Sequence, residues 1–200
     1  MDQNKLKMIV EAALLAAEQP LNLNQLSALF DEADAPSHRV LGGILEALRT
    51  DCEDRGVELV EVASGFRMQV KQSLEQWVGR LWQHRPPRYS RALLETLALI
   101  AYRQPVTRGE IEDVRGVSVS SNIMRTLQER GWVRTVGHRD VPGKPALFAT
   151  THEFLDYFGL KSLDELPPLS ELGDIGLEPE LELEPPAPIE PEQVNTGESA

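Results

Sequence analysis

The sequence has little of several residue types, and each shortage excludes a class of protein. Cys52 is the only cysteine, so an internal disulfide and a cluster of thiolate metal ligands are both excluded. Its acidic neighbours Asp51 and Glu53 disfavour a thiolate, so we interpret this cysteine as unreactive. No apolar run approaches the ~20 residues that span a bilayer. The first residues lack the pattern of a secretory signal peptide, and we therefore expect a cytoplasmic protein.

Recognisable arrangements of catalytic residues are also lacking. Gly143-Lys144-Pro145 is not a phosphate-binding loop, because the upstream glycine and the following Ser or Thr are missing. Sequence order leaves a Ser-His-Asp arrangement open, but no nucleophile-elbow motif occurs. The histidines lack the spacing of a zinc site; they are His38, His84, His138 and His152. We expect a protein that is not an enzyme and that binds no cofactor and no metal.

Positive charge is scarce in the chain as a whole but is concentrated in its middle. The formal net charge is −12. Residues 80–150 contain 12 basic and 6 acidic residues, which gives +6, whereas residues 161–200 contain 11 acids and one Lys, which gives −10. A local anionic partner for the central segment therefore remains open, although the chain is acidic.

Residues 1–83 show the pattern of three helices followed by a β ribbon. Apolar residues recur at helical spacing through residues 6–17, and Pro20 ends this helix. Asn22 and Gln25 have the spacing of a capping box at the start of the next helix. The remaining predicted elements are a buried helix face at Leu26, Leu29 and Phe30, a helix over residues 40–48, strands over 57–62 and 66–70, and a last helix capped by Ser73.

Residues 91–166 repeat this order. An apolar helix over residues 92–102 breaks at Gln104-Pro105, and a new helix starts at Thr107, where Glu110 completes a second capping box. The following elements are a third helix with Val119, Ile123 and Leu127 on one face, wing strands over 132–138 and 146–150 around Pro142-Gly143, and a short helix capped by Thr151. Helix, turn, helix, helix and ribbon is the order of a winged helix.

The two halves match at an offset of 85 residues. Gln19-Pro20 falls on Gln104-Pro105, and the first capping pair falls on the second. We predict a mainly α fold with small β ribbons (α+β), built from tandem winged-helix domains. The predicted boundaries are an N-terminal domain at 1–83, a Pro-rich joint at 84–90, a C-terminal domain at 91–166, and an acidic, Pro-rich, disordered tail at 167–200.

The charge pattern of the predicted third helix disfavours sequence-specific DNA reading. It carries only Arg125 and Arg130, with Glu129 on the same helix, whereas specific readers present a dense basic face. Weak DNA contact through Arg125 and Arg134 remains open, and a winged-helix transcription regulator is the alternative function. The other use of such a domain is protein binding, since a groove between helix and wing suits a partner's amphipathic helix. Candidate aromatic anchors, for each of which core packing is the simpler explanation, are Trp77, Trp82, Tyr89, Trp132, Tyr157 and Phe158.

The stretch from Leu93 to Ile111 resembles the signature of the segregation and condensation protein B (ScpB) family. The resemblance continues through residues 115–117, 127–130 and 136–145. A last stretch, residues 154–167, ends it at Pro167. Arg91 stands where the family commonly has a proline or a small residue, and Lys144 stands where it commonly has an Arg. Both departures are small. The acidic tail lies outside the shared pattern.

The resemblance implies a non-catalytic subunit of the SMC–kleisin condensin-like complex, acting in chromosome condensation and segregation during cell division. It implies a homodimer through the N-terminal domain, the kleisin ScpA as direct partner, and the SMC ATPase as a partner through the kleisin. From the residues we also expect weak or indirect DNA contact and no membrane, and we expect a cytoplasmic, nucleoid-associated location. The expected kleisin-binding residues are Tyr102, Arg103, His138, Arg139 and Lys144.

Overall fold

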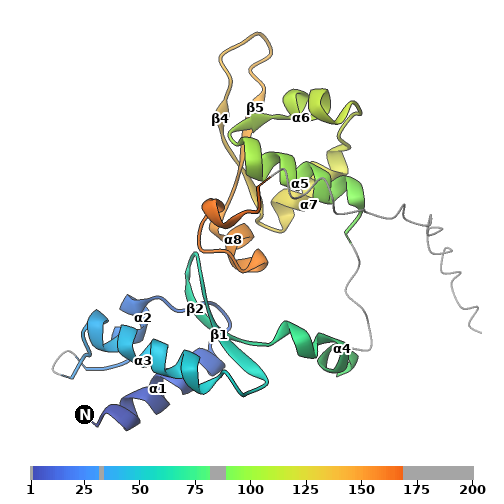
Figure 1. The fold of residues 1–200 in the computed structure, drawn as a ribbon. Coiled ribbons are helices and arrows are strands. Elements are labelled where there is room, and N and C mark those ends of the chain that lie inside the picture. Colours follow the sequence, from blue (N-terminus) through green and yellow to red (C-terminus); the bar gives the residue numbers. More distant parts are fainter. Residues whose placement is uncertain (1, 32–33, 82–88, 169–200) are drawn as a thin grey trace, which may run out of the picture. The chain divides into compact units, whose positions relative to one another are not determined.

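The computed structural model describes residues 2–31, 34–81 and 89–168. These residues form a mixed α+β fold in which helices alternate with two small antiparallel sheets, as the sequence predicts (Figure 1). The tail from residue 169 onward, Trp82 and most of the Pro-rich joint lie outside the described residues.

In the N-terminal half, three helices precede a two-stranded ribbon. The elements are α1 (Gln3–Ala16), α2 (Leu23–Ser27), α3 (His38–Asp51), β1 (Val57–Val62) and β2 (Gly65–Val70). The predicted capping box starts α2, because the Gln25 N–H donates to Asn22 Oδ1 (3.0 Å) and the Asn22 N–H donates to Gln25 Oε1 (2.9 Å). An isolated bridge pairs Leu21 with Phe66 and so ties the start of α2 to the ribbon.

Two predictions for this half are wrong. Leu29 is 49% exposed rather than buried. It lies beyond the end of α2 at Ser27, so helical spacing does not place its side chain on the buried face. Ser73 caps no helix; the chain forms the short segments η1 (Gln72–Leu74), α4 (Glu75–Val78) and η2 (Gly79–Leu81). None of these segments has a buried residue, so core packing does not hold them in one continuous helix.

The C-terminal half adds a third strand to the same plan. Its elements are α5 (Arg91–Arg103), β3 (Val106–Thr107), α6 (Arg108–Arg115), α7 (Ser121–Glu129), β4 (Val133–His138), β5 (Ala146–Thr150), α8 (His152–Phe158) and η3 (Leu163–Glu165). The sheet order is β3-β5-β4, with all pairs antiparallel. Ser120 caps α7, so Val119 precedes this helix instead of lying on its face, yet it is fully buried.

The internal repeat extends to the strand pairing. Val106 pairs with Phe148 in the C-terminal half, as Leu21 pairs with Phe66 in the N-terminal half. Each short pairing is followed directly by a capping box and a helix with one buried residue; these residues are Leu26 (0% exposed) and Ile111 (1% exposed). The same local signals therefore build the same corner of the fold twice.

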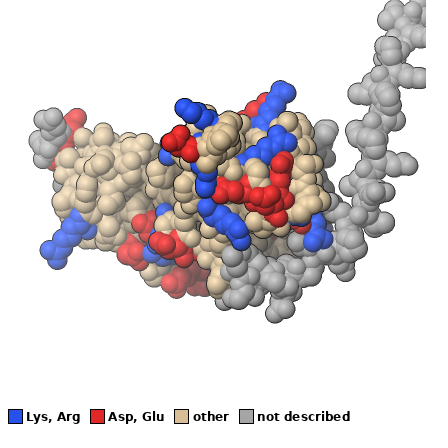
Figure 2. Space-filling view, turned by 90° about the horizontal axis from the view of Figure 1, so that it is seen from above, with Lys and Arg blue, Asp and Glu red and all other residues tan. Residues whose placement is uncertain are grey.

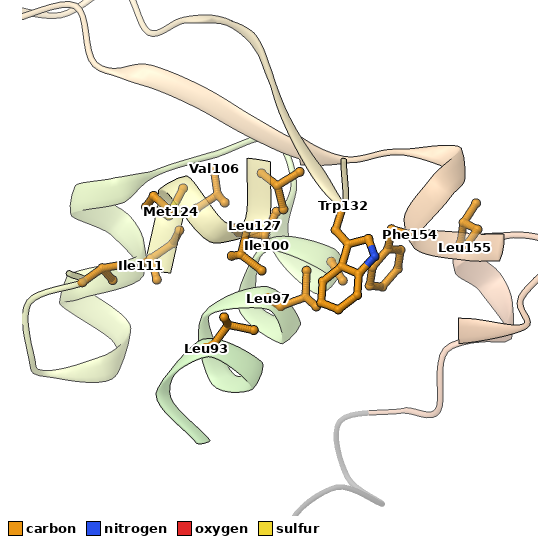
Figure 3. Close-up of a cluster of buried hydrophobic side chains, with 13 residues drawn as sticks. Leu93, Leu97, Ile100, Val106, Ile111, Met124, Leu127, Trp132, Phe154 and Leu155 are labelled. Atoms are coloured by element: carbon orange, nitrogen blue, oxygen red, sulfur yellow. The ribbon is translucent and has the colours of Figure 1, made fainter. Parts of the chain in front are cut away.

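Each half has its own cluster of buried apolar side chains. The N-terminal cluster joins α1, α2, α3 and β1. The C-terminal cluster draws on α5, α6 and α7, and it extends to α8 through Phe154 and Leu155 (Figure 3). Trp132 is 2% exposed and lies 4.6 Å from the Tyr157 ring, so this candidate anchor belongs to the core. The Trp77, Tyr157 and Phe158 side chains keep large exposed fractions.

Candidate partner-binding surface

A shallow hollow of about 350 Å³ lies where α5 ends, α6 begins and the wing leaves the domain. Its lining combines two cations, two acids and three apolar residues: Arg103, Arg139, Glu110, Asp113, Pro105, Val106 and Val114. These residues come from three separate stretches of sequence. The fold alone therefore brings them together.

The floor of the hollow is fixed by Gln104, which follows the last residue of α5. Gln104 Oε1 accepts hydrogen bonds from the Thr150 N–H (2.7 Å) and the Thr150 hydroxyl (3.0 Å). The next peptide bond, Gln104-Pro105, is cis, and Val106 then pairs with β5. The end of α5 and the start of β3 are thus both attached to β5, which gives Arg103 and Pro105 a defined place at the rim.

Glu110 joins the start of α6 to the wing. Its Oε2 accepts hydrogen bonds from the Thr107 N–H (2.8 Å), the Thr107 hydroxyl (2.9 Å) and Arg139 Nη2 (3.0 Å). The pKa of Glu110 is lowered, first by the Thr107 backbone N–H, then by its hydroxyl, and also by the Arg139 charge. The capping box therefore positions a wing residue as well as a helix.

Backbone hydrogen bonds close the wing beyond Arg139. The Arg139 N–H donates to the Pro145 carbonyl (2.9 Å), and the Lys144 N–H donates to the Val141 carbonyl (2.9 Å). Gly143 and Lys144 have positive φ values of 87° and 40° in this turn. A positive φ is uncommon for a residue other than glycine, such as Lys144. Arg139, Asp140 and Lys144 are exposed in this closed tip.

The acids of α6 have different roles. Glu112 Oε1 accepts hydrogen bonds from the Val119 N–H (2.8 Å) and Arg108 Nε (2.9 Å), so it fixes the loop before α7. The pKa of Glu112 is lowered chiefly by the Val119 N–H and then by Arg108. Asp113 has no side-chain hydrogen bond or ion pair among the described residues. Among these residues, its charge within the hollow is therefore unpaired.

Among the five expected kleisin-binding residues, Arg103 and Arg139 lie together in the hollow. The Tyr102 hydroxyl donates to the Pro167 carbonyl, while His138 and Lys144 are exposed on the wing and do not line the hollow. Sequence reasoning missed Pro105, Asp113 and Val114 as lining residues. The repeat assigned Val114 to the same position as Leu29, and the structure leaves both side chains exposed, at 45% and 49%.

The two candidate DNA-contacting residues do not form a basic surface. Arg125 pairs with Glu129 on its own helix, with Nε–Oε1 at 2.7 Å, and Arg134 is exposed on β4. Figure 2 shows acidic and basic side chains next to each other on the face that it displays. Such mixed charge gives little of the phosphate neutralisation on which nucleic-acid affinity depends.

The described residues contain no group of three or more His, Cys, Asp or Glu side chains that could hold a metal ion. No helix within the described ranges is long and apolar enough to cross a membrane.

Comparison with known proteins identifies the family. Residues 8–169 match the model of the family described as "Segregation and condensation complex subunit ScpB". The chain belongs to the ScpB family. The resemblance noted in the sequence is therefore confirmed, and the match extends over both halves of the chain.

Relatives from two bacteria agree with this assignment. The segregation and condensation protein B homolog of Coxiella burnetii is 56% identical over 169 residues, covering 84% of this chain and 81% of the relative. The segregation and condensation protein B of Syntrophotalea carbinolica is 45% identical and covers 90% of each chain. The ScpB name places these proteins in chromosome segregation and condensation.

Two solved ScpB structures are similar in sequence. ScpB from Mycobacterium tuberculosis is 36% identical, with 80% of this chain and 98% of that chain covered and a TM-score of 0.37. A dimer of a ScpB N-terminal domain, crystallised with a ScpA peptide, is 30% identical, with 44% and 100% covered and a TM-score of 0.36.

Proposed function

We propose that this chain is a non-catalytic subunit of a bacterial SMC–kleisin complex that binds the kleisin ScpA as a homodimer. The observation that carries the proposal is membership of the ScpB family over residues 8–169. ScpA links the chain to the SMC ATPase, so ATP hydrolysis belongs to that subunit. The chain acts in chromosome condensation and segregation, in the cytoplasm at the nucleoid, with DNA contact that is weak or indirect.

The proposed division of labour follows the two halves. Residues 1–83 supply the homodimer contact, and residues 91–166 supply the main ScpA surface. The hollow at Arg103 and Arg139 is the centre of that surface, and Tyr102, His138 and Lys144 extend it. Exposed aromatic and Arg side chains at the same domain suit a protein interface, because these residue types are enriched among interface hot spots.

The test is to mix the purified full-length chain with full-length ScpA and, separately, with duplex DNA. We expect a stable complex of two copies with one ScpA, measured by light scattering, and no complex of defined size with DNA. A sequence-specific DNA complex with a steep salt dependence, and no ScpA complex, would favour a transcription regulator instead.

The surface assignment needs variants that keep the fold. Arg139→Glu places a second carboxylate beside Glu110, so it would disturb the α6 cap as well as the surface. Arg139→Gln removes the charge without this repulsion. We expect Arg139→Gln with Arg103→Gln to abolish capture of ScpA while the circular dichroism spectrum stays that of the wild type. Unchanged capture would show that ScpA binds elsewhere, the N-terminal half included.

A further inference from the structure

The hollow has more free hydrogen-bond donors than free acceptors. Arg103 is exposed and has no ion-pair or hydrogen-bond partner for its guanidinium among the described residues. Arg139 uses Nη2 for Glu110, which leaves the other N–H groups of its guanidinium available. Both cations line the same 350 Å³ space. Two guanidinium groups at one site are suited to a carboxylate, which accepts two parallel N–H bonds.

The acids of the hollow do not balance these donors. Glu110 Oε2 already accepts from the Thr107 N–H, the Thr107 hydroxyl and Arg139, so one of its two oxygens is used within the fold, while Arg139 gives only one hydrogen bond to this pair. Asp113 is the lining acid whose carboxylate has no partner among the described residues. The surplus therefore favours an acidic ligand group, and Asp113 restricts where that group can sit.

The rest of the lining is apolar. Val106 is 4% exposed and forms part of the floor, while Val114 is 45% exposed and offers an uncovered aliphatic side chain. Pro105 lies beside Arg103 in the chain and adds a rigid apolar edge. A ligand that fills the hollow therefore needs an aliphatic group within a few residues of its acidic group.

We propose that the hollow binds a segment of ScpA in which an acidic side chain lies next to an aliphatic side chain. Arg103 and Arg139 bind the carboxylate, and Pro105 and Val114 contact the aliphatic group. Asp113 repels a second acid, so the hollow selects one acidic residue in a defined position rather than an acidic run. This inference rests on the proposed function, because it takes ScpA as the partner.

The inference predicts opposite changes in ScpA affinity when a positive and a negative charge of the hollow are removed. The dissociation constant of full-length chain and full-length ScpA is measured by calorimetry for Arg103→Gln, Asp113→Asn and the control Arg134→Gln. Arg103→Gln should weaken binding roughly threefold to tenfold, as expected for a partly exposed charge pair. Asp113→Asn should strengthen binding about twofold to fivefold. The control, an Arg on β4 outside the hollow, should change it by less than about twofold.

A charge swap then identifies the acidic group. Asp and Glu residues of ScpA are replaced singly by Lys and tested against Arg103→Glu. One of these ScpA variants should recover most of the lost affinity, and Arg103→Lys should retain more affinity than Arg103→Gln. Thermal unfolding of each variant controls for loss of fold.

The possible results separate the two proposals. Absence of a complex between wild-type chain and ScpA overturns the proposed function and this inference with it. A wild-type complex in which Arg103→Gln strengthens binding and Asp113→Asn weakens it shows a basic ligand and overturns the inference alone. A wild-type complex that neither change affects, or that no ScpA variant restores, also overturns the inference alone.

Discussion

Arg139 at the base of the wing donates from Nη2 to Oε2 of Glu110 over 3.0 Å, and Glu110 is also the third residue of α6 and completes its capping box. One carboxylate thus caps the start of a helix and holds a surface cation in place. A change in the cap should therefore be felt at the candidate partner surface.

The matched caps of the two halves test this link. Thr107→Ala and Asn22→Ala each remove a side chain that accepts from a helix N–H, and each should cost about 1 kcal/mol of unfolding free energy in urea titrations. Only Thr107→Ala removes a hydroxyl that donates to Glu110, so only this change should also weaken ScpA binding. Equal weakening by Asn22→Ala would argue against a local link between cap and surface.

The Glu110 charge should also appear in the pH dependence of stability. Its pKa is lowered in the folded state by the Thr107 N–H, so the ionised form contributes stability above the unfolded pKa of about 4.3, and that contribution is lost as pH falls through the lower folded pKa. Glu110→Gln keeps a capping amide without the charge. The urea midpoints of wild type and variant should differ at pH 7 and converge toward pH 3. A difference that stays constant over this range would show that the charge has no role.

Gly65 should tolerate no side chain. Its φ is +144°, and a Cβ there would lie 2.4 Å from the Leu21 carbonyl oxygen, at the bridge between Leu21 and Phe66. Gly65→Ala should therefore lower the melting temperature strongly or prevent folding. Gly43→Ala is the control, since its Cβ meets nothing within 4 Å and it lies in α3. That change should be neutral or stabilise by up to about 1 kcal/mol.

The two buried clusters should respond to equivalent truncations. Leu26 is 0% exposed and Ile111 is 1% exposed, at matching places in the two halves. Leu26→Ala and Ile111→Ala should each cost about 2–5 kcal/mol. Hydrogen exchange should show the loss of protection first in the half that carries the change. Uniform loss over both halves would indicate a single cooperative core.

Sequence reasoning succeeded where a local signal sufficed. The capping boxes at Asn22 and Thr107, the wing strands and the helix breaks all depend on residues a few positions apart, and the structure confirms them. It failed at Ser73, where helical periodicity lacked a surface to pack on. The hollow was found only in part, because Arg103 and Arg139 were picked from a family motif while Asp113 and Val114 depend on tertiary placement.

Comparison of the two repeats distinguishes the residues that form the capped start of α2 or α6 from those that line the hollow. At the offset of 85, Glu110 corresponds to Gln25, Asp113 to Ala28 and Arg103 to Glu18. Gln25 still completes its capping box, so the corner folds in both halves, but neither Arg103 nor Asp113 has an equivalent of the same charge in the first copy. The same scaffold is thus present twice, and only the second copy carries the charges that we expect to recognise a partner.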